Sequence, residues 1–269
     1  MPGVFHDLSK RLLMSSGIIL MMGIGFWGYA YLPVQLLTVV FIALITMTAM
    51  IEYVALVEHK GNPPSKYLMA AMGIFWTFAF YLFPSWIWLI LIFLGFFVYN
   101  FLCIEGSIYR VATGSFAMFY ILVPIGMILS FLYPKGIGST GDLALVVYLV
   151  AVTKMADVGG YFMGRLFGRT KLAPNISPSK TIVGAVFGLI SSMFMSLLLS
   201  CYINIQFFEA MILGLILGVA AELGDLAESV LKRDAQVKDS NQIPGLGGIL
   251  DLIDSLLFTT PILFAYFRF

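Results

Sequence analysis

The sequence has few charged residues, only two cysteines and only two histidines. Asp, Glu, Lys and Arg make up 11% of the 269 residues, whereas a soluble domain carries roughly 25%. Hydrophobic residues make up 61%, and the mean hydropathy is +0.99. The scarcity of charge excludes an ordinary soluble domain, because so much apolar surface can be covered only by lipid. We therefore expect an all-α polytopic membrane protein in a lipid bilayer, with no nucleic-acid partner.

The few cysteines and histidines also exclude some kinds of site. Cys103 and Cys201 both lie in apolar segments, so we interpret them as small buried apolar residues and not as a disulfide or a metal site. His6 and His59 lie far from the charged segments described below, which disfavours a zinc site and a histidine-based mechanism. No cleavable signal peptide is evident, because the first apolar run is about 20 residues long and lacks a clear small-residue cleavage site.

Nine apolar stretches are each long enough for one helical crossing at ~1.5 Å per residue. The expected spans are 12–31, 35–57, 67–83, 85–104, 116–133, 142–163, 181–203, 206–230 and 249–267. The first five spans carry few charges, so we expect residues 1–135 to form a membrane scaffold. The last four spans carry most of the intramembrane charge, so we expect residues 136–269 to form the catalytic region.

The positions of Lys and Arg predict the orientation of these spans. Twelve of the fifteen Lys and Arg residues lie in five segments that share one face under this topology. Only Lys135 and Arg268 lie on the opposite face, and Lys154 lies inside a span. Because cytoplasmic loops are enriched in Lys and Arg, we predict a cytoplasmic N-terminus and a C-terminus outside.

Four aspartates lie toward the predicted cytoplasmic ends of the last spans, namely Asp157, Asp225, Asp251 and Asp254. A carboxylate at membrane depth is unfavourable by about 3 kcal/mol unless it is paired, hydrated or metal-bound, so it marks a functional site. The predicted topology brings all four to the cytoplasmic side. Several aspartates at one depth suit Mg²⁺, which takes oxygen ligands from carboxylates, water and phosphates. We predict that Asp225 and Asp251 hold Mg²⁺, with Asp254 as a third ligand. The pattern leaves open whether a second, monovalent cation also binds.

The sixth expected span carries Lys154 and Asp157, three residues apart on one helical face. The two form either a structural ion pair or part of the site. Gly159, Gly160 and Gly164 follow, and we interpret them as backbone left bare beside the carboxylate for a bulky anion.

The segment from Arg165 to Thr181 mixes cations, hydroxyls and prolines, and a helix is predicted to begin near Thr181. Free backbone N–H groups at a helix N-terminus bind phosphate, so the segment is interpreted as a phosphate cradle. It is not a Walker loop, because the glycines are missing. The alternative is that its cations only reflect cytoplasmic topology. The predicted phosphate ligands of this segment and of the loop 231–248 are Lys171, Ser177, Lys180, Thr181, Lys232, Arg233 and Lys238.

The eighth expected span ends with Glu222, Asp225, Ser229 and Lys232. At ~100° per residue these positions fall within an ~80° stripe, so one polar face of an apolar helix is predicted to point inward. The two aspartates of the ninth span lie in its first turn, where carboxylates are also favourable caps. Helix capping explains one of these two aspartates. It does not explain both of them together with Asp225.

Two ordered runs of residues closely resemble the signatures of phosphatidate cytidylyltransferases (CDP-diacylglycerol synthases). The first run is Asp157, Gly160, Gly164, Phe167-Gly168, Lys171–Pro174, Ser177-Pro178, Lys180-Thr181 and Gly184. The second is Gly224–Leu226, Ser229, Lys232-Arg233, Lys238-Asp239, Pro244-Gly245, Gly247-Gly248, Asp251 and Asp254-Ser255. The resemblance implies a homodimeric, Mg²⁺-dependent inner-membrane enzyme, with its active site at the cytoplasmic face, that joins CTP and phosphatidic acid.

The resemblance also directs attention to individual residues. Together with the charge pattern it favours catalytic roles for Asp157, Lys180, Asp225, Lys232 and Asp251. Leu246 stands where family members usually have His, and Leu252 where they have Arg. These two departures are predicted to weaken the binding of CTP or pyrophosphate. The stretch from Lys238-Asp239 to Pro244 is also one residue shorter than in the family.

Two other classes of function fit parts of the pattern. A secondary transporter could use Lys154, Asp157, Glu222 and Asp225 as an ion or proton relay, but the charges cluster toward one face and no internal repeat is visible. A related membrane transferase is the other alternative, either a CTP-dependent lipid kinase or a CDP-alcohol phosphotransferase. The latter shows a denser aspartate motif inside one helix, which this sequence lacks.

Overall fold

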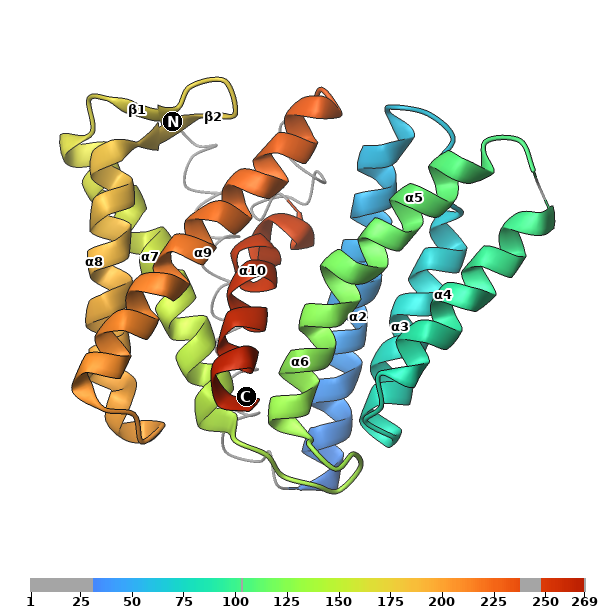
Figure 1. The fold of residues 1–269 in the computed structure, drawn as a ribbon, viewed down its shortest axis with the longest axis horizontal. Helices are drawn as coiled ribbons and strands as arrows, with labels where there is room; N and C mark the ends of the chain where they lie inside the picture. The colour runs from blue at the N-terminus through green and yellow to red at the C-terminus, as the bar shows by residue number, and fades with distance from the viewer. Residues whose placement is uncertain (1–30, 103, 238–247, 269) are drawn as a thin grey trace, which may run out of the picture. The chain divides into compact units, whose positions relative to one another are not determined.

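A computed structural model describes residues 31–102, 104–237 and 248–268 of the chain (Figure 1). Nearly all of its regular elements are helices, which confirms the predicted all-α class. The exception is an antiparallel hairpin of β1 (Lys171–Ala173) and β2 (Ser177–Thr181), in the segment between two expected spans. The chain forms two compact units, Met1–Leu143 with Ala235–Leu252, and Ala144–Asp234 with Ile253–Phe269. The expected functional division into 1–135 and 136–269 stays a prediction.

The described helices before residue 143 belong to the first unit. In chain order they are α2 (Leu32–Glu58), α3 (Lys66–Leu82), α4 (Ile87–Tyr99), η1 (Asn100–Leu102), α5 (Ser107–Ala117), η2 (Met118–Leu122) and α6 (Val123–Leu132). The last three form one continuous helix that begins well before the expected residue 116. Its middle segment, η2, has π-helical geometry directly before Pro124, which lacks a backbone N–H and therefore cannot continue the regular ladder.

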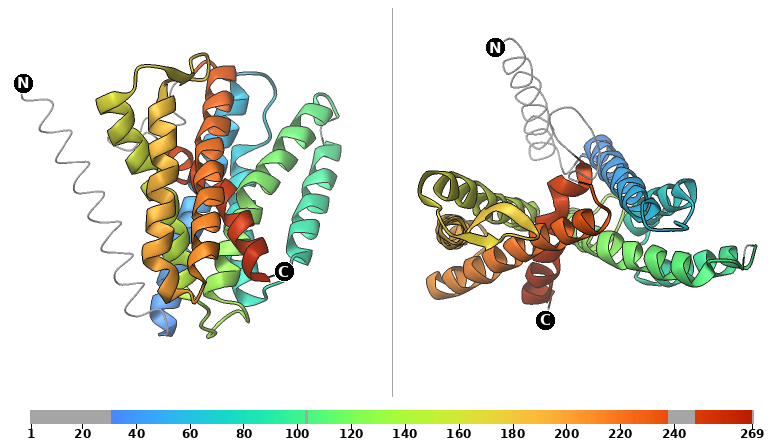
Figure 2. Two further views of the ribbon diagram at one scale, coloured as in Figure 1. Left: turned by 60° about the vertical axis from the view of Figure 1, so that its left-hand side comes forward. Right: turned by 90° about the horizontal axis from the view of Figure 1, so that it is seen from above.

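The second unit is built around a long antiparallel helix pair. Its elements are α7 (Leu143–Phe167), the hairpin, α8 (Ile182–Leu199), η3 (Ser200–Tyr202), α9 (Phe207–Asp234) and the later part of α10 (Ile249–Arg268). The chain runs along α7 and α9 toward the end that carries the hairpin, and along α8 away from it (Figure 2).

Small residues bring α8 and α9 close together. A Cβ added at Gly214 would lie 2.6 Å from Cβ of Ser196, and one added at Gly218 would collide with Oγ of Ser192. The Ser192 hydroxyl also donates to the Gly214 carbonyl at 2.9 Å. Such close approach lets helices pack in lipid, where apolar burial alone gives little driving force.

Six helices of the described part of the chain are long and apolar enough to cross a membrane. They are Leu32–Glu58, Ser107–Leu132, Leu143–Phe167, Ile182–Tyr202, Phe207–Asp234 and Ile249–Arg268. Two shorter apolar helices, Lys66–Leu82 and Ile87–Leu102, coincide with two more expected spans. The chain is therefore a polytopic, helical membrane protein. The expected span 12–31 lies outside the described residues, and the number nine stays a prediction.

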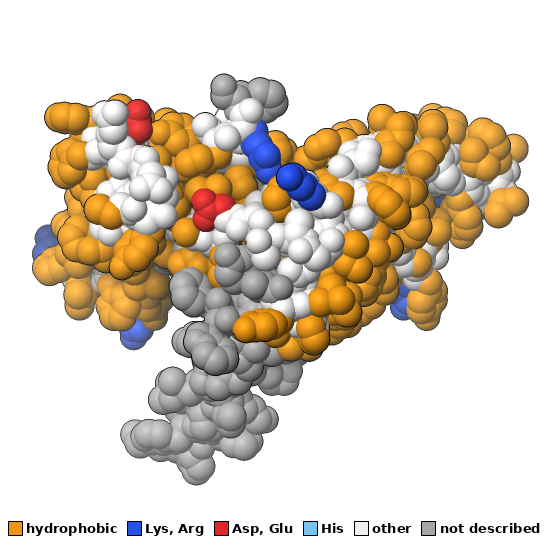
Figure 3. All heavy atoms as spheres, turned by 90° about the horizontal axis from the view of Figure 1, so that it is seen from below, with side chains coloured by type: hydrophobic (Ala, Val, Ile, Leu, Met, Phe, Trp, Pro, Cys, Tyr) orange, Lys and Arg blue, Asp and Glu red, His pale blue; other side chains and the backbone are white. Residues whose placement is uncertain are grey.

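The outward-facing side chains fit a lipid environment. Large apolar residues on α8, such as Ile190, Phe194 and Leu198, are exposed, and hydrophobic side chains cover most of the rim seen in Figure 3. One prediction is wrong here: Cys201 is an exposed free thiol in η3 and not a buried apolar residue, because the short helix faces it outward. Cys103 lies outside the described residues.

Candidate active site

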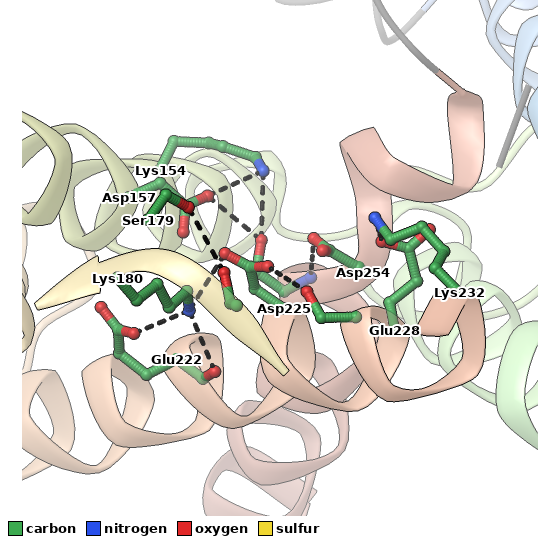
Figure 4. Close-up of polar contacts among 12 residues, drawn as sticks. Lys154, Asp157, Ser179, Lys180, Glu222, Asp225, Glu228, Lys232 and Asp254 are labelled. Carbon is green, nitrogen blue, oxygen red and sulfur yellow. Dashed lines mark hydrogen bonds and ion pairs between the residues drawn. The ribbon is translucent and has the colours of Figure 1, made fainter. Parts of the chain in front are cut away.

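Lys180 of the hairpin lies between two carboxylates of α9. Its Nζ is 2.8 Å from Oε2 of Glu222 and 3.0 Å from Oδ2 of Asp225 (Figure 4). Side chains alternate along a strand, so Lys180 and Thr181 at the end of β2 point in opposite directions. Thr181 is buried beneath the hairpin. The lysine and Glu222 side chains are each only 17% exposed. The hairpin thus delivers one cation to the polar face that the spacing in α9 predicted.

The charge on Lys180 is held by these neighbours. Burial alone would lower the pKa of its ammonium group, but the carboxylates of Asp225 and Glu222 outweigh that effect. The net result is a pKa raised above the ordinary value of 10.5. Lys180 is therefore a fixed cation at neutral pH.

A second group of polar side chains joins α7 to α10. Nζ of Lys154 lies 3.0 Å from Oδ2 of Asp157 and 3.1 Å from Oγ of Ser255. The Ser255 hydroxyl lies 3.2 Å from the same Asp157 oxygen, so the three form a closed triangle. Hydroxyls of Thr153 and Thr259, 3.0 Å apart, link the same two helices. The ion pair predicted from the spacing is present, and a serine of another helix completes it.

Asp254 belongs to the same cluster of charges. It is 5% exposed and interacts electrostatically with Asp225, Lys154 and Asp157. Its carboxylate accepts the backbone N–H of Ser255. Four carboxylates and two lysines from α7, β2, α9 and α10 therefore meet in the second unit, as Figure 4 shows.

The donor chemistry of this cluster suits Mg²⁺. Mg²⁺ takes oxygen ligands and needs only one or two protein carboxylates when water and phosphates complete its shell. Asp225 and Asp254 offer such oxygens and interact with each other. Within the described ranges no three acidic, histidine or cysteine side chains converge as a metal site, and Lys180 is paired with Asp225 instead.

Asp251 belongs to the first unit, at the beginning of α10. Its Oδ2 accepts the backbone N–H of Gly248 at 2.8 Å, so it caps the helix. Capping was the alternative role foreseen for one of the two aspartates of this turn, and the structure shows it for Asp251. Its role as a metal ligand stays a prediction.

The glycines after Asp157 serve helix packing. A Cβ at Gly159 would collide with Oγ of Ser191 in α8, and one at Gly164 would lie 2.9 Å from Oγ1 of Thr181. At Gly160 the nearest atom would be the Gly184 carbonyl oxygen at 3.3 Å. Our interpretation of these glycines as space for a bulky anion is wrong, because α8 and its cap fill that space.

The predicted phosphate-binding segment has the expected helix start. Helix α8 begins at Ile182, and Oγ1 of Thr181 accepts the Gly184 N–H at 3.1 Å. The Thr181 side chain is thus committed to capping. Lys171 is exposed in β1, and the Ser177 hydroxyl lies 3.4 Å from that of Ser179.

The other predicted basic ligands lie toward the end of α9. Nε of Arg233 donates to the carbonyl of Ile176 at 3.0 Å, which ties the hairpin turn to the helix. Nζ of Lys232 lies 2.6 Å from Oε2 of Glu228, whose side chain is fully buried. Lys238 and Leu246 lie outside the described residues.

Sequence reasoning left three of these polar groups out of the site. The sequence places Glu222 on the polar stripe and gives it a role only in the transporter alternative, and Ser255 enters only as part of a motif. Glu228 was missed entirely. Its position four residues before Lys232, the spacing of an ion pair on one helical face, was the signal that could have found it.

The chain is similar in sequence to known proteins. A profile of the cytidylyltransferase family matches residues 9–269. The chain is 40% identical over 169 residues to a phosphatidate cytidylyltransferase of Chlamydia muridarum, an alignment that covers 60% of this chain and 55% of that protein. It is 43% identical over 139 residues to the phosphatidate cytidylyltransferase of Haemophilus influenzae, covering 47% of this chain and 46% of that protein. For the Synechocystis sp. protein of the same name the identity is 43% over 127 residues, covering 46% and 43%.

The chain spans about half the length of these curated relatives. The family profile, in contrast, extends over nearly the whole chain, including the residues of both compact units. The chain belongs to the cytidylyltransferase family.

Proposed function

We propose that this protein transfers the cytidylyl group of CTP to phosphatidic acid, which gives CDP-diacylglycerol and pyrophosphate. The observation that carries the proposal is the position of Lys180, which the hairpin holds against Glu222 and Asp225 beside the Lys154–Asp157 pair. Membership of the cytidylyltransferase family supports the reaction type, and the names of the relatives support the lipid substrate.

The reaction needs alignment and charge neutralisation more than covalent help from the protein. An oxygen of the lipid phosphate attacks the α-phosphorus of CTP and forms a new P–O bond. The bond from that phosphorus to the oxygen bridging to the β-phosphorus breaks, and pyrophosphate leaves with the electron pair. The attacking oxygen is already ionised, so no protein nucleophile or general base is required.

The chain's cations are proposed to bind the phosphates. Lys180, held charged by two carboxylates, would bind the triphosphate near the reacting phosphorus. Asp157, whose Oδ2 lies 3.0 Å from Nζ of Lys154, would orient that lysine. Further phosphate ligands are proposed from the hairpin and from the end of α9 and the loop that follows: Lys171, Ser177, Thr181, Lys232, Arg233 and Lys238.

Mg²⁺ is proposed as the cofactor, held by Asp225 and Asp251 with Asp254 as a further ligand. When bound, the ion would neutralise phosphate charge and polarise the reacting phosphorus. The carboxylates are oxygen donors of the kind that Mg²⁺ prefers, which supports this assignment. A second, monovalent cation stays open.

The membrane topology belongs to the same proposal. We propose nine spans, a cytoplasmic N-terminus, a C-terminus outside, and an active site at the cytoplasmic face of the inner membrane. The concentration of Lys and Arg on one side of the expected topology supports this orientation. A homodimer is proposed from the family resemblance.

Two labelled forms of CTP test the reaction directly. The purified protein is incubated with phosphatidic acid and CTP carrying radioactive phosphorus at either the α or the γ position, and the lipid product is identified. Cytidylyl transfer places the α label in the lipid and releases the γ label in pyrophosphate. A CTP-dependent lipid kinase would place the γ label in the lipid instead. CTP-independent solute uptake by proteoliposomes, with no labelled lipid, would favour a transporter.

Single substitutions then test the proposed ligands. Asp225→Asn and Asp251→Asn are each expected to lower transfer by at least about 100-fold, because each removes a charge that the transition state needs. Glu58→Gln, at an exposed position at the end of α2, is the matched control and is expected to keep full activity. Near-full activity of either aspartate variant at low Mg²⁺ would contradict its role as a ligand.

A further inference from the structure

A carboxylate from the first half of the chain holds the beginning of α10. Glu52 of α2 is 1% exposed. Its Oε1 accepts the backbone N–H of Ile249 at 3.0 Å, and its Oε2 accepts that of Leu250 at 2.8 Å. All of these residues belong to the first unit. Neither of the two motif runs that carry the family resemblance contains Glu52.

The hydrogen bonds of Glu52 satisfy both its buried carboxylate and the first N–H groups of α10. A buried carboxylate is costly unless it is hydrogen-bonded, and the first N–H groups of a helix have no partner within the helix. The positive end of the helix dipole also favours an anion at this place. Because each oxygen takes a different N–H of consecutive residues, the contact restrains both the position and the rotation of the helix end.

Asp251 is the next residue after this pair of contacts. It caps the N–H of Gly248, so the carboxylates of Asp251 and Glu52 together satisfy three consecutive N–H groups. Glu52 takes two of them. The first turn therefore keeps a strong cap when the Asp251 carboxylate turns toward another partner, and the backbone that carries Asp251 stays in place.

We infer that Glu52 is a positioning residue for Asp251. It fixes the first turn of α10 and relieves Asp251 of most of the capping, so that the Asp251 carboxylate can serve the transfer site. This inference rests on the proposed function, because it assigns Asp251 to that site. In this role Glu52 acts through Asp251 and is not assigned to contact substrate or cation.

The test compares three variants of the full-length protein in detergent. Glu52→Gln keeps the size of the side chain but turns one acceptor into an NH₂ donor that faces a backbone N–H. Glu52→Ala removes both acceptors. Thr46→Val is the matched control, because Thr46 is a fully buried polar residue of the same helix whose hydroxyl bonds only its own helix, at Ile42.

Three measurements separate positioning from general stability. Amide hydrogen exchange over residues 248–251 is expected to be at least about tenfold faster in both Glu52 variants, with α8 and α9 protected as in the wild type. Binding of Mn²⁺, as a probe for Mg²⁺, is expected to weaken by about tenfold. The turnover number is expected to fall by about 10- to 100-fold with little change in KM for CTP, because misplacement of a reacting group affects kcat. Thr46→Val is expected to match the wild type in all three.

Each contrary outcome has a definite meaning. Unchanged exchange in Glu52→Gln would show that Glu52 does not hold the turn. Faster exchange with unchanged Mn²⁺ affinity and turnover would assign Glu52 to structure alone, as would a lower yield of Glu52→Gln with normal turnover per folded molecule. All of these overturn the inference. If the wild type itself forms no CDP-diacylglycerol, the proposed function fails. The measurements of amide hydrogen exchange and of Mn²⁺ binding still decide the role of Glu52.

Discussion

Lys180 and Asp225 form an ion pair 3.0 Å long between a hairpin strand and a long apolar helix. The same lysine lies 2.8 Å from Glu222, one turn earlier on that helix. A cation that binds Asp225 must therefore share its carboxylate with Lys180 or displace the lysine toward Glu222. This relationship ties the predicted phosphate ligands to the predicted metal ligands.

Removing the Lys180 ammonium group should abolish most of the transfer activity. In Lys180→Met the triphosphate loses a cation, and Glu222 and Asp225 are left without their shared counter-ion. We expect turnover to fall by about 100-fold or more, the usual effect of removing a group that stabilises transition-state charge. CTP incorporation into lipid measures it, and Lys135→Met, a change in a connecting segment of the first unit, is the control. A Lys180→Met protein with more than a tenth of wild-type turnover would contradict this role.

The pH dependence of activity should not report Lys180. Because its pKa is raised above 10.5, the ion pair contributes fully below that pH and is lost only as the pH rises through the higher folded value. Between about pH 7 and pH 9 the lysine stays charged. The pH profiles of the wild type and Lys180→Arg are therefore expected to have the same shape over this range. A shift of the alkaline limb in Lys180→Arg would show that Lys180 titrates there.

The contact between α7 and α8 should tolerate no side chain at Gly159. A methyl group there would collide with the Ser191 hydroxyl, so Gly159→Ala is expected to lower stability by about 2 kcal/mol through overpacking. Gly95→Ala in α4 is the matched control, because a Cβ there meets nothing within 4 Å. Alanine also favours the helix over glycine. Thermal unfolding in detergent, followed by far-ultraviolet circular dichroism, compares the two. Equal stability of both variants would show that α7 and α8 can separate at no cost.

The two departures from the family pattern predict a gain of function. Leu252 is half-buried in the first turn of α10, beside Asp251. Leu252→Arg combined with Leu246→His is expected to raise turnover by up to about tenfold, the equivalent of one added charge-assisted hydrogen bond. Steady-state rates at saturating CTP and phosphatidic acid measure the effect. No gain in the double variant would show that these positions do not limit the rate.

The sequence predicted the helical part of the fold well, because lipid imposes a simple rule on apolar runs. Expected spans such as 35–57, 142–163 and 206–230 match α2, α7 and α9 to within a few residues. The polar stripe of α9 was also predictable, since helical periodicity places Glu222 and Asp225 on one face. The start of α8 beside Thr181 followed from the change of composition there.

The features that were missed depend on contacts between distant segments. Residues 171–181 carry prolines and charges that are typical of a loop, and their pairing as β1 and β2 is settled by cross-strand hydrogen bonds. The role of Gly159 could not be read from spacing, because a bare backbone serves an anion and a neighbouring helix equally well. The contact of Glu52 with Ile249 joins residues 197 positions apart, and no local sequence pattern predicts it.

That contact also constrains the order in which the protein can be completed during synthesis. The first unit includes residues Ala235–Leu252, so a nascent chain that has made only its early helices lacks the backbone N–H groups of Ile249 and Leu250 that Glu52 binds. Until Leu250 has been synthesised, these two hydrogen bonds of the Glu52 carboxylate cannot form. The first unit therefore gains these contacts of α2 only after the chain has been synthesised as far as α10.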